Sequence, residues 1–243
     1  MLIFYILSYI ELTLNYISSN QLKQKELLLE KRYNLNKYKY TKDTGKCYKF
    51  ISEKIGYITL KSIKDEDIPV IKREFFNTKG IIIDIRNYPS ANTPYTLGNY
   101  FVSKSTPFVK ATKGNINNPG EFTFTPSLEI PKSKEYYEGK LVVIVNEETQ
   151  SAAEFVAMAF RAGDNTTIIG SQTAGADGNA PEIVLPGGLK TRISGIGIYY
   201  PNGGETQRIG IVPDIEVKPT IKGLIERRDE LLEKAIEIIN SDG

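Results

Sequence analysis

Short apolar runs alternate with amphipathic segments along most of the chain. The runs rich in valine and isoleucine are Ile55–Leu60, Gly80–Arg86, Lys140–Val145 and Thr166–Ile169. Continuous apolar runs of this length are typical of strands that are buried on both faces of a parallel sheet. Apolar residues recur at helical spacing in Asp65–Asn77, in the segment that begins at Ser151, and in Arg227–Asn240. Strands and helices that alternate with short connections predict an α/β fold in which helices flank a parallel sheet.

The remaining segments of the second half are less regular. We expect a helix over Tyr95–Val102, an antiparallel hairpin from Ala180–Leu185 and Lys190–Ile193, and a last strand over Ile211–Val217. Residues Ser103–Glu138 form a long stretch that is rich in proline. A loop of this length in a compact domain is either functional or a small excursion of its own. A hairpin that covers the site and a surface flap without a role are the two interpretations.

The N-terminal residues do not match a standard targeting signal. Residues 1–19 are apolar, but they lack a basic start and a small-residue cleavage site, and Glu11 and Asn15 interrupt the apolar run. A buried helix, a weak membrane-associating segment and the remainder of a longer protein are all compatible with this pattern; the last is preferred. Gln21–Glu30 fits a helix or a frayed strand, and Arg32–Lys46 fits an edge strand or a linker. We therefore expect residues 1–50 to be a remnant or linker and residues 51–243 to form the main domain.

Composition excludes several classes of function. The chain has 31 basic and 29 acidic residues, and glutamates are interspersed among its N-terminal lysines, which predicts a solvated face rather than a nucleic-acid site. The single cysteine, Cys47, excludes an intramolecular disulfide and a multi-cysteine metal site. The chain contains no histidine, which excludes a Ser-His-Asp triad or a histidine zinc site built from this chain alone. No metal or cofactor is expected.

Ser151 stands where a predicted strand turns into a predicted helix. As an N-cap, it would form the capping box Ser151-x-x-Glu154, in which the serine hydroxyl and the glutamate carboxylate each accept from an orphan amide. As a nucleophile, it would lie at the positive end of the helix, with the amide of Ala152 free to stabilise an oxyanion. Both interpretations use the same geometry, so spacing does not decide between them.

Four motifs in a fixed order resemble those of the serine peptidases that include the carboxy-terminal processing (tail-specific) proteases and the tricorn core. The matching residues are Ile82–Pro89; Asn146, Thr149, Ser151, Ala152 and Glu154; Ile168, Ile169, Gly170, Thr173 and Gly175; and Gly210, Ile211, Pro213 and Asp214. The likeness covers about residues 55–240 and is greatest to cell-envelope members of the Bacteroidota. It implies a crotonase/ClpP-like layered α/β fold with an additional antiparallel hairpin.

The resemblance also implies roles for individual residues. Ser151 corresponds to the nucleophile, and the amide of Ala152 to one oxyanion donor. Ser90, in the turn after Ile82–Pro89, corresponds to the position of the second oxyanion amide, where the processing proteases have glycine. The oxyanion donor is a backbone amide, so serine can replace glycine at this position if it can adopt the required backbone conformation.

The general base of the resembling enzymes has no counterpart here. Processing proteases use a lysine in a T-x-G-K turn, and that position is Ala176. The tricorn-like branch uses an upstream histidine and a late glutamate. Asp177 and Glu205 remain as carboxylates for an auxiliary role, although a carboxylate is a poor base for a serine hydroxyl unless burial raises its pKa. The resembling proteins normally begin with a helical region and a peptide-binding module, and neither fits before Ile55. The N-terminal residues are therefore interpreted as the remnant of a truncation.

Two functions of different classes follow, with a third that is weaker. The first is a serine-type peptidase that hydrolyses polypeptides, without metal or nucleic acid, in the periplasm or cell envelope. The second is a catalytically inactive relative or fragment that binds peptides. An acyl-CoA enzyme of the crotonase type would share the fold but would not account for the motif around Ser151. The sequence indicates no oligomeric state.

Overall fold

The computed structural model of the chain describes residues 10–18, 21–29 and 45–241. The chain divides into two compact units, Met1–Asp43 and Thr44–Gly243. In the first unit, strands β1 (Ile10–Ser18) and β2 (Gln21–Leu29) pair as an antiparallel hairpin, so Gln21–Glu30 takes the strand alternative. Residues 1–9 and most of Arg32–Lys46 lie outside the described residues. Within the described part, no helix is long and apolar enough to cross a membrane.

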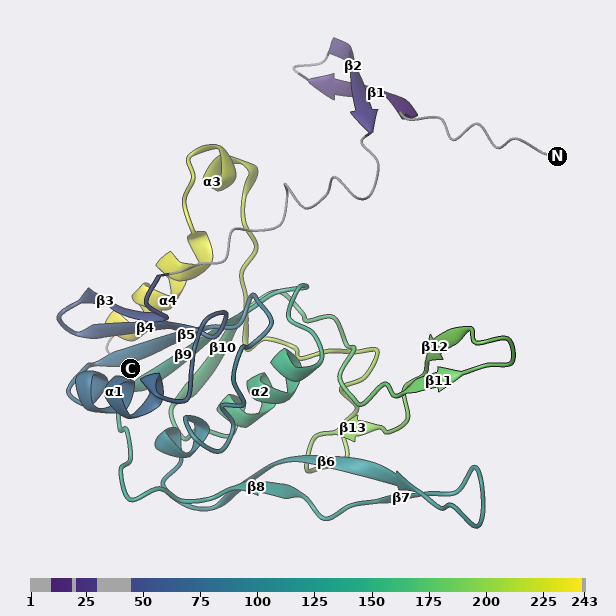
Figure 1. Ribbon diagram of the computed structural model, residues 1–243. Coiled ribbons are helices and arrows are strands. Elements are labelled where there is room, and N and C mark those ends of the chain that lie inside the picture. Colours follow the sequence, from purple (N-terminus) through teal and green to yellow (C-terminus); the bar gives the residue numbers. More distant parts are fainter. Residues whose placement is uncertain (1–9, 19–20, 30–44, 242–243) are drawn as a thin grey trace. The chain divides into compact units, whose positions relative to one another are not determined.

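A six-stranded sheet forms the centre of the second unit (Figure 1). Its order is β14 (Ile215–Glu216), β10 (Thr166–Gly170), β9 (Lys140–Val145), β5 (Gly80–Asp84), β4 (Ile55–Thr59) and β3 (Tyr48–Ser52). All neighbours are parallel except β3, which runs antiparallel to β4. The four long apolar runs are therefore the four central strands, as expected. The edge strand β3 was not expected, because its exposed and buried residues do not alternate cleanly.

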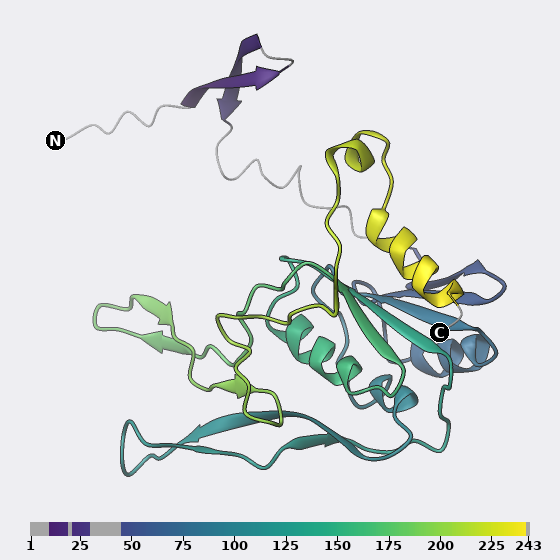
Figure 2. The same cartoon turned by 180° about the vertical axis from the view of Figure 1, so that it is seen from behind.

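Helices cover both faces of this sheet. Helices α1 (Asp67–Phe75) and α2 (Ala152–Arg161) lie on one face, and α4 (Glu230–Asn240) lies on the other (Figure 1, and from behind in Figure 2). Along β9, Leu141, Val143 and Val145 belong to the core on the α1 and α2 side, whereas Val142 and Ile144 pack with α4. Burial on both faces explains why the strands read as continuous apolar runs.

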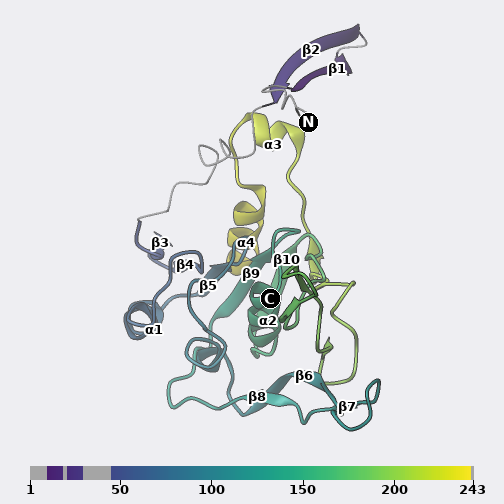
Figure 3. The same cartoon turned by 45° about the vertical axis from the view of Figure 1, so that its right-hand side comes forward.

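Antiparallel strands form an excursion beside α2 (Figure 3). Strand β6 (Thr106–Gly114) pairs with β7 (Phe122–Phe124), β8 (Leu128–Ile130) and β13 (Ile198–Tyr199). A separate hairpin consists of β11 (Glu182–Val184) and β12 (Lys190–Arg192). The second hairpin was expected from the sequence; for the long proline-rich stretch, a hairpin was one of the two interpretations.

Two expectations about local structure were wrong, and one short helix was missed. The helix predicted over Tyr95–Val102 is only a short 3-10 helix, Gly98–Phe101, and a glycine at its start is a poor helix former. The predicted last strand begins late, at Ile215, because Pro213 offers no amide and the Asp214 side chain takes the Ile168 amide instead. The short helix α3 (Ile221–Ile225) was not predicted.

Candidate active site

The sharp turn between β9 and α2 places Ser151 at the carboxyl edge of the sheet. Its backbone has φ 54° and ψ −121°, a conformation that residues other than glycine rarely adopt. In α/β-hydrolases, such a strained strand-to-helix turn presents a serine hydroxyl at the mouth of a sheet. An observed backbone outlier of this kind points to a functional position. Ser151 is therefore a candidate functional residue as well as a helix cap.

The buried carboxylate of Glu154 holds this turn against a second one. Its Oε2 accepts from the amides of Ser151 at 3.0 Å and Ala176 at 2.9 Å. Its Oε1 accepts from Thr173 Oγ1 at 2.5 Å and from the amide of Gly175 at 2.7 Å. Glu154 is only 1% exposed, and these four hydrogen bonds replace the water that a buried carboxylate loses. The expected capping box is present, and Glu154 also fixes the glycine-rich turn.

A shallow hollow of about 240 Å³ lies between the start of α2 and the turn after β5. Ala152, Phe155, Ser90 and Ala91 are among its lining residues. Within the described part of the chain, the Ala152 amide has no hydrogen-bond acceptor, which suits an oxyanion donor. The structure thus brings the two turns expected to form the oxyanion site to one hollow.

Ser90 does not have a free amide in this arrangement. Its amide donates to Leu60 O at 2.9 Å, and its hydroxyl donates to Ile63 O at 2.6 Å. The amide of the next residue, Ala91, has no acceptor among the described residues. The turn expected to supply the second oxyanion amide is in place. The free amide in this turn belongs to Ala91, however, and not to Ser90 as expected.

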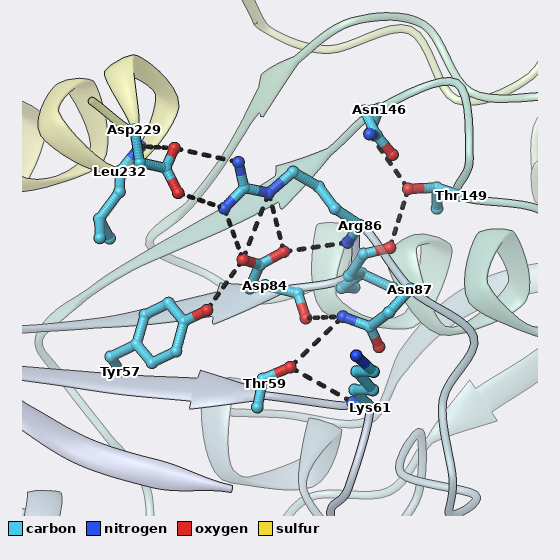
Figure 4. A network of polar contacts seen from close by, with 11 residues as sticks. Tyr57, Thr59, Lys61, Asp84, Arg86, Asn87, Asn146, Thr149, Asp229 and Leu232 are labelled. Atoms are coloured by element: carbon cyan, nitrogen blue, oxygen red, sulfur yellow. Dashed lines mark hydrogen bonds and ion pairs between the residues drawn. The ribbon is translucent and has the colours of Figure 1, made fainter. Parts of the chain in front are cut away.

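Arg86 anchors the base of this turn (Figure 4). Its guanidinium donates to Asp84 Oδ2 at 2.7 Å and, as a fork, to the two carboxylate oxygens of Asp229 at 3.0 and 2.7 Å. Tyr57 adds a hydrogen bond to Asp84 at 2.9 Å. Burial opposes the charge on Arg86, but the bonds to both carboxylates outweigh it and raise the pKa of the guanidinium. Because Asp229 precedes α4, this fork ties the last helix to the end of β5.

Two further side chains stabilise the turns that follow β5 and β9, and one of them connects the two turns. Asn87 Nδ2 donates to Asp84 O at 3.1 Å, which closes the first turn on itself (Figure 4). Thr149 Oγ1 donates to Ile85 O at 2.9 Å and accepts from the Asn146 amide at 3.1 Å. Side-chain hydrogen bonds of Arg86 and Asn87 therefore hold the turn that follows β5.

Asp177 and Glu205 face a second hollow, of about 270 Å³, that is also lined by Ala176. Asp177 is 7% exposed; its Oδ1 accepts from the Gly178 amide at 2.7 Å, whereas the buried Oδ2 has no partner. Burial raises the pKa of Asp177 to about 7, and the nearby charge of Glu154 adds to the effect. Glu205 is exposed and pairs with Arg208 at 3.3 Å.

Gln207 and Arg208 form part of the wall of this second hollow, and this strap of two residues is hydrogen-bonded to the glycine-rich turn. Gln207 Nε2 donates to Asp177 O at 2.7 Å and to Ile196 O at 2.9 Å, and the Arg208 amide donates to Gly175 O at 2.6 Å. Gly175 has φ 66°, and a Cβ there would approach the backbone of Arg208 at 2.9 Å. Gln207 was not predicted as a site residue, and no local pattern in the sequence marks it.

The site contains no complete catalytic pair within the described residues. No side chain there forms a hydrogen bond with the Ser151 hydroxyl, and no group of three or more metal-ligating side chains is found in the same part of the chain. What the arrangement offers chemically is a strained serine at a helix N-terminus, amides that face one hollow, and two carboxylates that line a second hollow.

Comparison with known families matches residues 54–217 to peptidase family S41. Among curated proteins, the chain resembles one from Chlamydia trachomatis, with 29% identity over 121 residues. That match covers 46% of this chain and 20% of the relative, so the chain spans about a fifth of the length of the curated relative it matches.

Solved structures of low sequence identity share the fold. A peptidase from Parabacteroides merdae has a TM-score of 0.73 at 20% identity, covering 94% of this chain and 78% of that one. Mature CPAF in complex with lactacystin has a TM-score of 0.69 at 15% identity, with coverage of 96% and 69%. The photosystem II D1 C-terminal processing protease has a TM-score of 0.53 at 17% identity, with coverage of 97% and 60%. The expected ClpP-like layered fold is confirmed.

Proposed function

The chain belongs to peptidase family S41 and carries its serine-peptidase domain, and from this premise we propose that Ser151 is the nucleophile of peptide-bond hydrolysis. The observation that carries the assignment is the backbone of Ser151, at φ 54° and ψ −121° on the turn into α2. The family match favours this function over a catalytically inactive, peptide-binding relative. We assign the peptidase domain to residues 51–243, which contain the matched range.

In the proposed reaction, Ser151 Oγ attacks the carbonyl carbon of the substrate while a solvent water molecule takes the hydroxyl proton, and solvent later gives a proton to the leaving amine. The electron pair of the carbonyl moves to oxygen, and the amide of Ala152 donates to that oxyanion from the positive end of α2. The turn at 89–92 supplies the second amide, from Ala91 where Ser90 is engaged. Collapse of the intermediate expels the amine and leaves an acyl group on Ser151, which water then hydrolyses.

Asp177 and Glu205 take an auxiliary role in this scheme. Both line the hollow beside the nucleophile turn. Neither forms a bond with Ser151, so they would act on the site only through their negative charge. Asp177 is the stronger of the two because it is buried and has a pKa of about 7, whereas Glu205 is exposed and already pairs with Arg208. No metal or cofactor is part of the scheme.

Membership of a peptidase family fits binding of a peptide substrate. We propose that the substrate is a polypeptide held in an extended conformation, as an added strand. We place the protein in the periplasm or cell envelope, an assignment supported by its resemblance to cell-envelope members of the family; fractionation of the source cells tests it.

Labelling with a fluorophosphonate probe tests the nucleophile. We expect one adduct by intact mass on the full chain, and its loss in Ser151→Ala. Ser171→Ala, which removes a surface hydroxyl that donates to Glu147, is the matched control and should keep the adduct. An adduct that persists in Ser151→Ala, or no adduct on protein shown to be folded by circular dichroism, would contradict the assignment.

A further inference from the structure

We infer that the hollow around Asp177 is a subsite that binds a positively charged side chain, lysine or arginine, of the polypeptide substrate. The inference rests on the proposed function in one respect, since it takes the ligand to be part of a peptide. Three features of the described residues carry it: the position of the hollow, the unpartnered carboxylate inside its wall, and the apolar surfaces around it.

The hollow lies directly beside the nucleophile turn. The amides of Ser151 and Ala176 donate to the same oxygen of Glu154, at 3.0 and 2.9 Å. The two nitrogens therefore lie no more than about 6 Å apart, because hydrogen bonds of ordinary length share one acceptor. Ala176 and Asp177 both line the hollow. A substrate whose carbonyl reaches Ser151 consequently has a neighbouring side chain within reach of this space.

Asp177 lacks the partner that a buried carboxylate requires. More than nine tenths of the residue is buried, one oxygen accepts only from the adjacent Gly178 amide, and the other accepts nothing. Leaving a buried acceptor unsatisfied is costly, so native proteins seldom keep such a group without a use. A cation that enters the hollow would balance the negative charge of this carboxylate.

The remaining walls suit the stem of a long basic side chain. Ile198 and Tyr199 provide apolar surface, and two carboxylates, Asp177 and Glu205, face the single cation of Arg208. Lysine and arginine bury their methylene stems against apolar surface while the charged end finds a carboxylate. The volume of about 270 Å³ is large enough, since a water molecule takes about 30 Å³ in the liquid.

The charge of the subsite depends on pH. Burial and the nearby charge of Glu154 raise the pKa of Asp177 to about 7, while Glu205 and Arg208 are the other charged groups that line the hollow. A cation binds the ionised form, so its affinity should increase as the pH rises from 6 to 8.

Binding of a small cation to Ser151→Ala protein tests the inference without any turnover. The probes are n-butylguanidinium and its neutral isostere n-butylurea, titrated by NMR at pH 8. We expect the cation to bind at least ten-fold more tightly than the urea, and this preference to weaken about ten-fold at pH 6. Asp177→Asn, in the same background, should abolish the preference.

The matched control is Asp65→Asn, because Asp65 is an exposed carboxylate that lines a different hollow beside α1. It should leave the preference unchanged. Equal binding of the two probes, persistence of the preference in Asp177→Asn, or an equal loss in Asp65→Asn would overturn the inference. Fluorophosphonate labelling of the wild type separates the two levels: labelling without cation binding refutes the subsite alone, and cation binding without labelling refutes only the nucleophile assignment.

Discussion

Glu154 is the residue on which the geometry of Ser151 depends. The position of its carboxylate explains how a serine can persist at φ 54°: four donors from two turns converge on one buried group. Strained backbone conformations cost roughly 1–3 kcal/mol each and persist only where the surroundings over-determine them. We therefore propose that Glu154 is a positioning residue for Ser151.

Glu154→Gln should uncouple the two turns while keeping the shape of the side chain. An amide group places its own donor against amides that already donate, so we expect the free energy of unfolding to fall by roughly 1–3 kcal/mol. The rate of fluorophosphonate labelling of Ser151 should fall at least ten-fold. Glu148→Gln changes an exposed neighbour and should alter neither value. A labelling rate that is unchanged in Glu154→Gln at equal foldedness would refute the positioning role.

Asp177 should make the protein less stable as the pH rises. Because burial raises its pKa to about 7, the folded protein binds this proton more tightly than the unfolded chain does. The stability that follows is complete at low pH and is lost as the pH rises through 7. Asp177→Asn should therefore stabilise the protein at pH 8 by on the order of 1–3 kcal/mol more than at pH 5, measured by urea unfolding. An equal effect at both pH values would contradict this account.

Single residues also show where sequence reasoning stops. Ser151, Ala152 and Glu154 could be identified because a capping box and a motif are local patterns. The engagement of the Ser90 amide by Leu60, and the strap formed by Gln207, could not, because each depends on a contact between segments that are distant in the chain. The orphan oxygen of Asp177 follows from burial, which local sequence does not reveal.

At the scale of elements, the fork of Arg86 connects the last helix to the sheet. Asp229 accepts from Arg86 and also caps α4 by accepting from the Leu232 amide at 3.1 Å. Although burial opposes its charge, the bonds to Arg86 lower the pKa of Asp229. Asp229 therefore contributes stability that is present above the pKa of an ordinary aspartate and is lost as the pH falls through its lowered value.

Asp229→Asn should weaken the docking of α4 but not the start of the helix. Asparagine is as good an N-cap as aspartate, so the cap remains while the ion pair is lost. We expect a loss of roughly 1–2 kcal/mol in the free energy of unfolding at pH 7, with faster amide exchange in α4. Glu237→Gln, whose carboxylate is exposed on the same helix and pairs only with Lys234, is the control. A smaller effect than that of the control would contradict the proposed anchor.

The elements themselves could be predicted wherever the pattern was long and regular. The central strands and helices α1, α2 and α4 were identified because their faces are either wholly apolar or clearly amphipathic. The edge strand β3, the two-residue strand β14 and the short helix α3 carry too few residues for a periodic signal. Their structure comes from pairing and packing against elements that are already formed.

At the scale of the peptidase unit, the turns at the carboxyl ends of several parallel strands meet at one edge of the sheet, where α/β proteins place their sites. The turn after β9 is bound to the turn after β5 through Thr149 Oγ1. The same turn is bound to the one after β10 through the Ala174 amide and through Glu154. Thr173 Oγ1 continues the chain of bonds by accepting from the Ile211 amide at 2.7 Å. The turns at this edge of the sheet are therefore joined by hydrogen bonds into one assembly.

If these turns act as one assembly, losses at its two threonines should not add. We expect Thr149→Val and Thr173→Val each to slow the labelling of Ser151 about ten-fold, since each leaves a buried backbone partner unsatisfied. The double variant should slow it much less than a hundred-fold, because contacting residues in one network couple by roughly 0.5–3 kcal/mol. Thr166→Val is the control: its buried hydroxyl, on β10 itself, has no partner among the described residues, so its removal should cost nothing. A strictly multiplicative double variant would show instead that the turns support Ser151 independently.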